Sequence, residues 1–166
     1  MRLCIYMKPL TDRDLGWLEG IIDGEGCLGL YKNKRNDRPS GRGFVWVTAL
    51  QIGSTDLKIV NRVRELLGTG GITLNRRPKE QNARVLYLFR AGSGCLRELL
   101  PVLHLTSKQL QRDLLIEACK LVAEHKAGLW HLGGKRTHDG RLEEIHTEMK
   151  RLNHRGLPEH SNTREE

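Results

Sequence analysis

The sequence predicts an α+β fold in which helices back one face of a curved, antiparallel four-stranded sheet. Helical and strand periodicities follow one another in the order helix, strand, strand, helix, strand, strand, helix. Each pair of predicted strands is joined by a polar segment, as in a hairpin. The first helix is apolar on two sides, which is typical of a helix that is buried on both. An αββαββα chain of this kind leaves the second face of the sheet open.

The first helix is expected to begin after Thr11, a good N-cap residue that is followed three positions later by the acidic Asp14. Its apolar residues fall on two sides, with Leu15, Leu18 and Ile22 on one and Trp17 and Ile21 on the other. We expect one side to pack on the sheet and the other on a second subunit.

Three glycines, Gly16, Gly20 and Gly24, lie four residues apart along this helix. Each costs up to about 1 kcal/mol inside a helix, so the line needs a reason. Close passage of a second backbone along that face is the simplest one. Asp23 and Glu25 follow where the helix ends, which indicates metal chemistry at a junction between two helices.

The next segments alternate between strands and a helix. Residues 27–34 and 44–52 predict one hairpin, and residues 72–76 and 84–91 predict another. Between the hairpins, Ser54 and Thr55 are expected to cap a helix that Gly68 ends.

The C-terminal part is predicted to be helical. Residues 93–100 form a short helix stopped by Pro101, and a longer one opens at residues 106–109 with inward-facing positions Leu110, Leu114, Ala118, Leu121 and Val122. The composition changes between Gly128 and Gly140. We therefore expect a core domain over residues 1–126 and an extension over 127–166. That extension holds one helix at about 140–153, with Leu142, Ile145, Met149 and Leu152 at helical spacing, and a disordered tail.

Composition restricts the functional classes. The 166 residues carry a formal net charge of +8, which favours polyanionic partners. No apolar run approaches the ~20 residues of a membrane-spanning helix, and no secretory signal is evident. The four cysteines are scattered, which predicts reduced thiols in an intracellular protein and argues against a zinc site. The spacing of the C-terminal histidines also fits no compact ligand set.

Strand alternation assigns the two faces of the sheet. The helix-covered face is expected to hold Leu28, Leu30, Trp46, Leu50, Ile52, Ile72, Leu74, Tyr87 and Phe89. The open face then holds the residues between them, including Gly29, Val47 and Ala49, and collects Asn, Gln and Arg side chains of the kind that read base edges in the major groove of double-stranded DNA. The predicted DNA-binding residues on the strands and in their two basic loops are Tyr31, Asn33, Lys34, Arg35, Arg38, Arg42, Gln51, Thr73, Asn75, Arg76, Arg77, Lys79, Arg84 and Arg90.

The stretch from Leu18 to Gly26, LEGIIDGEG, resembles the signature of the LAGLIDADG homing endonucleases. It keeps the leading leucine, the packing glycine Gly20, the apolar pair, Asp23, a small residue, the acid Glu25 and the final glycine. It departs from the pattern at Glu19, where that family has a small residue. The resemblance continues less specifically through Gln51-Ile52 and the LGTG stretch at 67–70, as far as about residue 125.

The resemblance implies a divalent-metal-dependent DNA endonuclease with the fold described above. It implies that Glu25 and the backbone carbonyl of Gly24 bind Mg²⁺, for which Mn²⁺ substitutes. It also implies catalytic roles for Gln51, near the scissile phosphates, and for Lys108, as the lysine that orders the attacking water. Thr106 occupies one position where the pattern would have a lysine.

The signature occurs once, so the resemblance implies a homodimer. Its interface would be formed by the first helix, through Gly16, Trp17, Gly20, Ile21 and Gly24. Such a dimer would make a double-strand break near the centre of a long pseudo-palindromic target, leaving short 3′ overhangs. Enzymes of this kind are encoded in mobile introns or inteins and act in the cytoplasm, nucleoid or organelle matrix.

Two other functions remain open at this point. One is a binding protein on the same fold, either an RNA maturase for its host intron or a DNA-binding regulator that does not cut. The other is a basic α/β module that binds RNA as a monomer. The glycine line and the retention of Glu25 favour the nuclease, because neither alternative needs an acid at that position.

Overall fold

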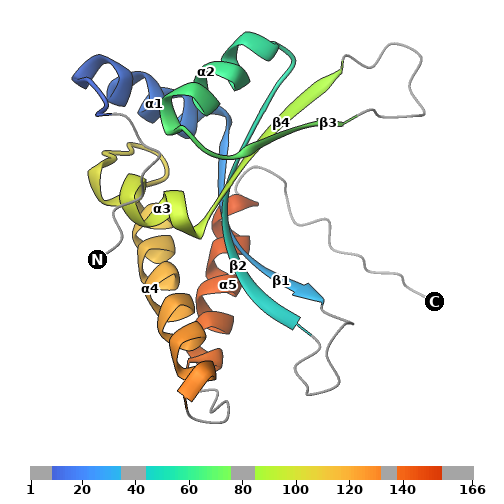
Figure 1. The fold of residues 1–166 in the computed structure, drawn as a ribbon, viewed down its shortest axis with the longest axis vertical. Coiled ribbons are helices and arrows are strands. Elements are labelled where there is room, and N and C mark those ends of the chain that lie inside the picture. Colours follow the sequence, from blue (N-terminus) through green and yellow to red (C-terminus); the bar gives the residue numbers. More distant parts are fainter. Residues whose placement is uncertain (1–8, 35–43, 76–84, 132–137, 155–166) are drawn as a thin grey trace, which may run out of the picture.

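The computed structural model describes residues 9–34, 44–75, 85–131 and 138–154 (Figure 1). Its elements are α1 (Asp12–Glu25), β1 (Gly26–Lys34), β2 (Phe44–Ser54), α2 (Leu57–Leu67), β3 (Gly71–Asn75), β4 (Leu86–Gly92), α3 (Ser93–Leu99), α4 (Gln109–His131) and α5 (Asp139–Asn153). The strands form one antiparallel sheet in the order β1-β2-β4-β3. The α+β architecture and the αββαββα order are confirmed.

Helix α1 begins as the sequence predicts. The hydroxyl of Thr11 accepts a hydrogen bond from the backbone N–H of Asp14 at 3.2 Å, and acidic residues occupy the first turn. Leu18 and Ile22 are fully buried against the sheet. The helix ends at Glu25, and β1 starts at the next residue. This direct turn fixes the end of the helix against the start of an edge strand.

The strands show the predicted alternation of faces. Leu28, Leu50 and Ile52 are buried on the helix-covered face, as expected. On the open face Gly29 and Ala49 are buried as well, since the Tyr31 ring covers Gly29 and Ala49 lies on a central strand between Gly29 and Gly92. Leu74 was expected to be buried but is 47% exposed, because β3 is an edge strand whose end extends beyond the helices (Figure 1).

The start of α2 corrects one predicted cap. The N-cap is Asp56, whose carboxylate accepts from the Lys58 N–H at 2.8 Å. Ser54 acts one step earlier, since its hydroxyl accepts from the Asp56 N–H at 3.0 Å. Asp56 prevails over Thr55 because its charged oxygen is the stronger acceptor at a helix N-terminus. At the other end Gly68 adopts a φ of 63°, the left-handed conformation predicted for it.

Helix α4 enters the core with a different register from the one predicted. Its buried stripe is Gln111, Leu115, Ala118, Cys119 and Val122, at helical spacing. Leu110 was expected to face inward but is 49% exposed, because Gln111 occupies the inward position of the first turn. Pro101 does not stop the preceding helix abruptly; the chain continues in a 3-10 turn over Leu100–Val102. The helix also runs without a break past Gly128 to His131.

Helix α5 packs onto β1 and α4 and adds its four predicted apolar residues, Leu142, Ile145, Met149 and Leu152, to the buried residues of the chain. Two of its side chains bond edge carbonyls of β1: His146 Nδ1 donates to the Leu30 carbonyl at 2.6 Å, and Asn153 Nδ2 to the Leu28 carbonyl at 3.0 Å. These bonds cover an edge that would otherwise be unpaired.

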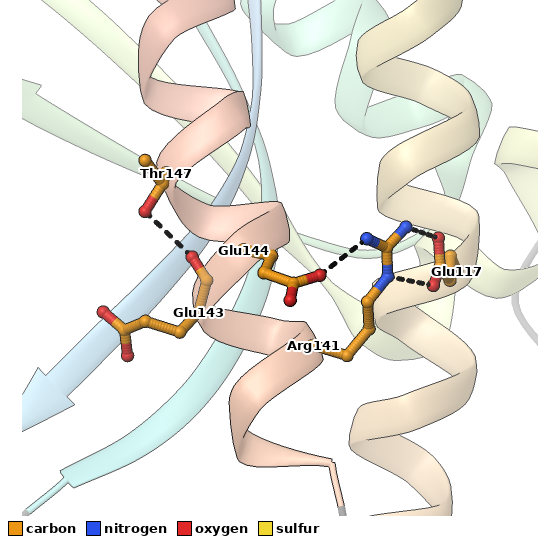
Figure 2. Close-up of polar contacts among 5 residues, drawn as sticks. All are labelled: Glu117, Arg141, Glu143, Glu144 and Thr147. Carbon is orange, nitrogen blue, oxygen red and sulfur yellow. Dashed lines mark hydrogen bonds and ion pairs between the residues drawn. The ribbon is translucent and has the colours of Figure 1, made fainter.

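Figure 2 shows how α5 is joined to α4. Arg141 on α5 donates two hydrogen bonds to the Glu117 carboxylate on α4, at 2.7 and 2.9 Å, and a third to Glu144. An isolated exposed pair adds little stability, but a bidentate arginine with two carboxylates fixes the relative orientation of the two helices. The division of the chain near residue 126 and the disordered tail stay predictions, since residues 155–166 lie outside the described ranges.

No helix in the described part of the chain is long and apolar enough to cross a membrane.

Candidate metal and nucleic-acid site

The carboxyl end of α1 presents Glu25 at the surface, immediately before the strand that enters the sheet. The turn is tight: a Cβ on Gly26 would lie 2.6 Å from the Ile22 carbonyl oxygen, which accepts the Gly26 N–H. Only glycine fits there without a backbone shift. The last carbonyls of a helix lack intrahelical donors, so Glu25 lies beside a partial negative charge that attracts cations.

Lys108 reaches this helix end from the segment that precedes α4. Its ammonium donates hydrogen bonds to the carbonyls of Ile22 and Asp23, at 2.8 and 2.7 Å. Burial lowers the pKa of Lys108, and the negative charges of Asp23 and Glu25 act in the opposite direction. The structure therefore brings Lys108 next to the predicted metal position, where it neutralises part of the charge at the end of α1.

Asp23 is the residue that docks α4 onto α1. Its carboxylate accepts from the backbone N–H groups of Thr106, Ser107 and Lys108 at 2.7 to 3.2 Å, and from the Ser107 hydroxyl at 3.0 Å. Burial is the largest influence on its pKa and acts upward, but the hydrogen bonds together hold the pKa of Asp23 below its usual value. Thr106, where the pattern would have a lysine, contributes its backbone N–H to this docking.

A hydrogen bond gives a structural reason for Glu19, the position at which the chain departs from the signature. One turn before Asp23, its Oε1 accepts the backbone N–H of His104 at 2.6 Å. The two acids lie on the same side of α1 and together bind the backbone of residues 104–108. A small residue at position 19 would leave that N–H without this partner.

Gln51 lies in a row of side chains that crosses the open face of the sheet. It pairs with Cys27 on β1 and with Arg90 on β4. Because Cys27 is two residues beyond Glu25, this row begins beside the helix end. Gln51 is half-buried and Arg90 is exposed, so both are placed for contact with a ligand on that face.

The other described residues of the predicted DNA-reading face differ in exposure. Asn33 and Thr73 are exposed. Tyr31 lies along the open face over Gly29, with its hydroxyl 3.8 Å from Cys27 Sγ, and the Arg90 guanidinium lies 5.4 Å from its ring centroid. Burial, with help from Cys27, raises the pKa of Tyr31 to about 12. The Tyr31 ring therefore supports the Arg90 guanidinium, in addition to any contact that it makes with a ligand.

Several predicted contacts are not placed by the structure. Lys34 is exposed and pairs with Phe44, so by alternation it shares the side of Lys32 and Trp46 and not that of Asn33. Outside the described residues lie Arg35, Arg38, Arg42, Arg76, Arg77, Lys79, Arg84 and the side chain of Asn75. The roles of all these residues stay predictions.

The glycine line forms an uncovered face of α1. Gly16, Gly20 and Gly24 are exposed, and a Cβ added at any of them would meet no atom within 4 Å. Beside it Trp17 and Ile21 are half-buried, and Trp17 is stacked under the Arg62 guanidinium at 4.4 Å. No contact within the described residues requires glycine at these three positions.

An open cleft of about 490 Å³, which we call the junction cleft, lies between the start of β1, the first turn of α4 and the end of α5. The residues that line it include Gly26, Cys27, Ser107, Lys108, Gln111 and Asn153. Sequence reasoning missed Gln111. The available signal was a polar residue in phase with the apolar stripe of α4. Within the described residues, no group of three or more His, Cys, Asp or Glu side chains could hold a metal within one chain.

No protein-family model and no curated protein matches the chain, but solved structures do. The archaeal intron-encoded homing endonuclease I-Vdi141I, solved with DNA, is 17% identical, with a TM-score of 0.61 over 89% of this chain and 89% of its own. The homing endonuclease I-TnaI is 18% identical, with a TM-score of 0.62 over 86% and 97%. The LAGLIDADG meganuclease I-AabMI, bound to uncleaved DNA, is 19% identical, with a TM-score of 0.60 over 86% and 45%. The chain thus has the fold of these endonucleases, and the resemblance read from residues 18–26 is confirmed at the level of the fold.

Proposed function

We propose that the chain is a homing endonuclease that acts as a homodimer and makes a Mg²⁺-dependent double-strand break in a long, pseudo-palindromic DNA target. The observation that carries the proposal is Glu25 at the exposed carboxyl end of α1, directly beside an uncovered line of glycines. A second copy crossing at that line would bring two such helix ends together.

The donors at this helix end fit a hard divalent cation. The carboxylate of Glu25 and the carbonyl of Gly24 are oxygen ligands, and Mg²⁺ takes one or two protein carboxylates while keeping several waters. Bound there, the metal supplies Lewis-acid activation for phosphodiester hydrolysis. Lys108 holds the neighbouring carbonyls of Ile22 and Asp23, so the last turn of α1 stays in place.

Three observations support duplex DNA as the substrate. The net charge of +8 favours a polyanion. The open sheet face carries Asn33, Gln51, Thr73 and Arg90, which are of the types that contact base edges and phosphates. The similar structures I-Vdi141I and I-AabMI are DNA complexes.

The test is cleavage of a randomised duplex library by the purified protein, with and without Mg²⁺, beside the variant Glu25→Gln. We expect cuts at one enriched, roughly two-fold site that require Mg²⁺ or Mn²⁺. Glu25→Gln keeps the size of the side chain and removes its charge, and should lower the cleavage rate by more than about 100-fold, beyond the loss from a supporting group.

Asp12→Asn, at the opposite end of the same helix, is the matched control and should cut normally. Site-specific binding without cleavage in any divalent metal would contradict the nuclease and favour a regulator. Preferential binding of structured intron RNA would favour a maturase. A monomer that binds RNA without a DNA preference would favour the simple RNA-binding module.

A further inference from the structure

The junction cleft is lined by one largely buried polar side chain, whose amide group reaches the open cleft. Gln111 is 6% exposed, lines the cleft, and makes no hydrogen bond with any described residue. It occupies a core position of α4, in phase with the buried Leu115 and Ala118. Because the Gln111 amide group reaches the open cleft, it is available to a ligand bound there.

The charge of the cleft wall favours an anion. Among the described residues that line it, Lys108 is the one that carries a charge. Two of the three donors of its ammonium are used by Ile22 and Asp23, which leaves one. The nearby Asp23 carboxylate is already occupied by N–H and O–H donors from residues 106–108. The Lys108 ammonium therefore keeps one donor for an anion, and the Gln111 amide group offers two more.

The walls of the cleft are fixed. Asn153, at the end of α5, is tied to β1 through the Leu28 carbonyl, and the Arg141–Glu117 pair holds α5 against α4 (Figure 2). The floor begins at Gly26, the residue after Glu25. An anion bound in the cleft would consequently lie next to the predicted metal position.

We propose that the junction cleft binds a phosphate group of the DNA backbone adjacent to the phosphate that is cut, with the Gln111 amide and the Lys108 ammonium as donors. The DNA source rests on the proposed function, since the cleft adjoins Glu25. Phosphate is the shared chemistry, and a free phosphate-bearing molecule is the alternative source.

The first experiment does not depend on cleavage. The isotope-labelled protein is titrated with inorganic phosphate and, separately, with a DNA duplex, while NMR follows the side-chain NH₂ group of Gln111. We expect saturable shifts with both, at much lower concentrations of the duplex. No shift with either would overturn the proposal. A shift with inorganic phosphate but not with the duplex would overturn the DNA backbone as its source.

The second experiment uses Gln111→Met, with Gln109→Met as the matched control. Gln109 lies in the same helical turn, but its amide bonds Asp113. We expect Gln111→Met to bind duplex DNA about tenfold or more weakly, because a hydrogen bond to a charged group is lost. Its unfolding midpoint should change little, since methionine has a similar volume and the Gln111 amide makes no hydrogen bond with the described residues. Unchanged affinity in a folded Gln111→Met protein would contradict the proposal.

A duplex series locates the phosphate. Single phosphates at the centre of the selected target are replaced by neutral methylphosphonates. We expect one replacement to weaken binding by the wild type and to weaken Gln111→Met no further. If every replacement weakens both proteins equally, the Gln111 contact is rejected while the nuclease stands. If no target is cut but the duplex shifts Gln111, the nuclease is rejected and the phosphate site stands.

Discussion

Two acidic residues at the end of α1 are two positions apart and serve different purposes. Asp23 turns back toward the protein and binds the backbone of residues 106–108, whereas Glu25 stays exposed. The difference follows from helix geometry, because positions 23 and 25 point to different sides of the helix. Asp23 lies one turn after Glu19, on the side that meets residues 104–108. Position 25 is thereby left for a ligand.

Replacement of Asp23 by Asn should destabilise the fold by about 1 to 2 kcal/mol. The asparagine amide has one acceptor oxygen in place of two. The expected loss of stability is at the low end of the range for hydrogen bonds to a charged acceptor, because the Asp23 side chain is partly exposed. The carboxylate has a lowered pKa in the fold, so its contribution is complete above the unfolded pKa of about 4 and is lost as the pH falls through the folded value.

The check is urea unfolding of wild type and Asp23→Asn at a series of pH values. The difference in unfolding free energy should be constant between pH 6 and 8 and shrink below about pH 4. Glu65→Gln, an exposed acid on α2, is the control. A difference that grows on acidification would contradict the role assigned to Asp23.

The sequence predicted most elements because local rules decided them. Helix caps depend on neighbouring residues only, as at Thr11 and Gly68. The buried side of α5 follows from the helical spacing of its four apolar residues. The errors arose where tertiary packing decides. The register of α4 depends on its packing against β1, β2 and α5, and in that packing Gln111 is buried while Leu110 is exposed. The docking of residues 104–108 by Glu19 and Asp23 spans more than eighty positions, and no periodicity reveals it.

At the scale of elements, α5 completes the sheet edge. His146 donates to the Leu30 carbonyl, and its ring meets Trp46 edge-on at a centroid distance of 5.5 Å. Trp46 in turn donates to Asp139, at the start of the helix, at 3.2 Å. Helix α5 is therefore joined to β1 and β2 along most of its length. Strands that read DNA need such support, because their position sets which bases they meet.

His146→Ala should lower the unfolding free energy by about 1 to 3 kcal/mol, from a lost hydrogen bond and lost packing on Trp46. His146→Asn keeps an N–H donor near the position of Nδ1 and should recover part of the loss. Urea unfolding measures both, with His154→Ala, at the exposed end of α5, as the control. Equal stability of His146→Ala and wild type would show that α5 does not support β1 through this contact.

At the scale of the whole molecule, the described residues leave two surfaces uncovered, the open face of the sheet and the glycine line of α1. The sheet and helices α2, α4 and α5 bury the apolar residues of the protomer, yet the glycine line of α1 stays uncovered. Those glycines weaken the isolated helix by up to about 1 kcal/mol each. A chain that acted alone would gain stability by replacing them, whereas the proposed dimer would use them for the close approach of a second backbone.

The variant Gly20→Leu tests the proposed dimer without weakening the fold of the single chain. No atom of the chain lies within 4 Å of the added Cβ, and leucine favours a helix over glycine by about 0.8 kcal/mol, so the fold itself should not be weakened. The side chain would instead hold two α1 helices apart. We expect wild type to sediment as a dimer and Gly20→Leu as a folded monomer that cannot make double-strand breaks. Gly140→Leu, at an equally open helical glycine on α5, should remain a dimer. A monomeric wild type that still cuts both strands would remove the reason offered for the glycine line, since a single α1 would then suffice to build the site.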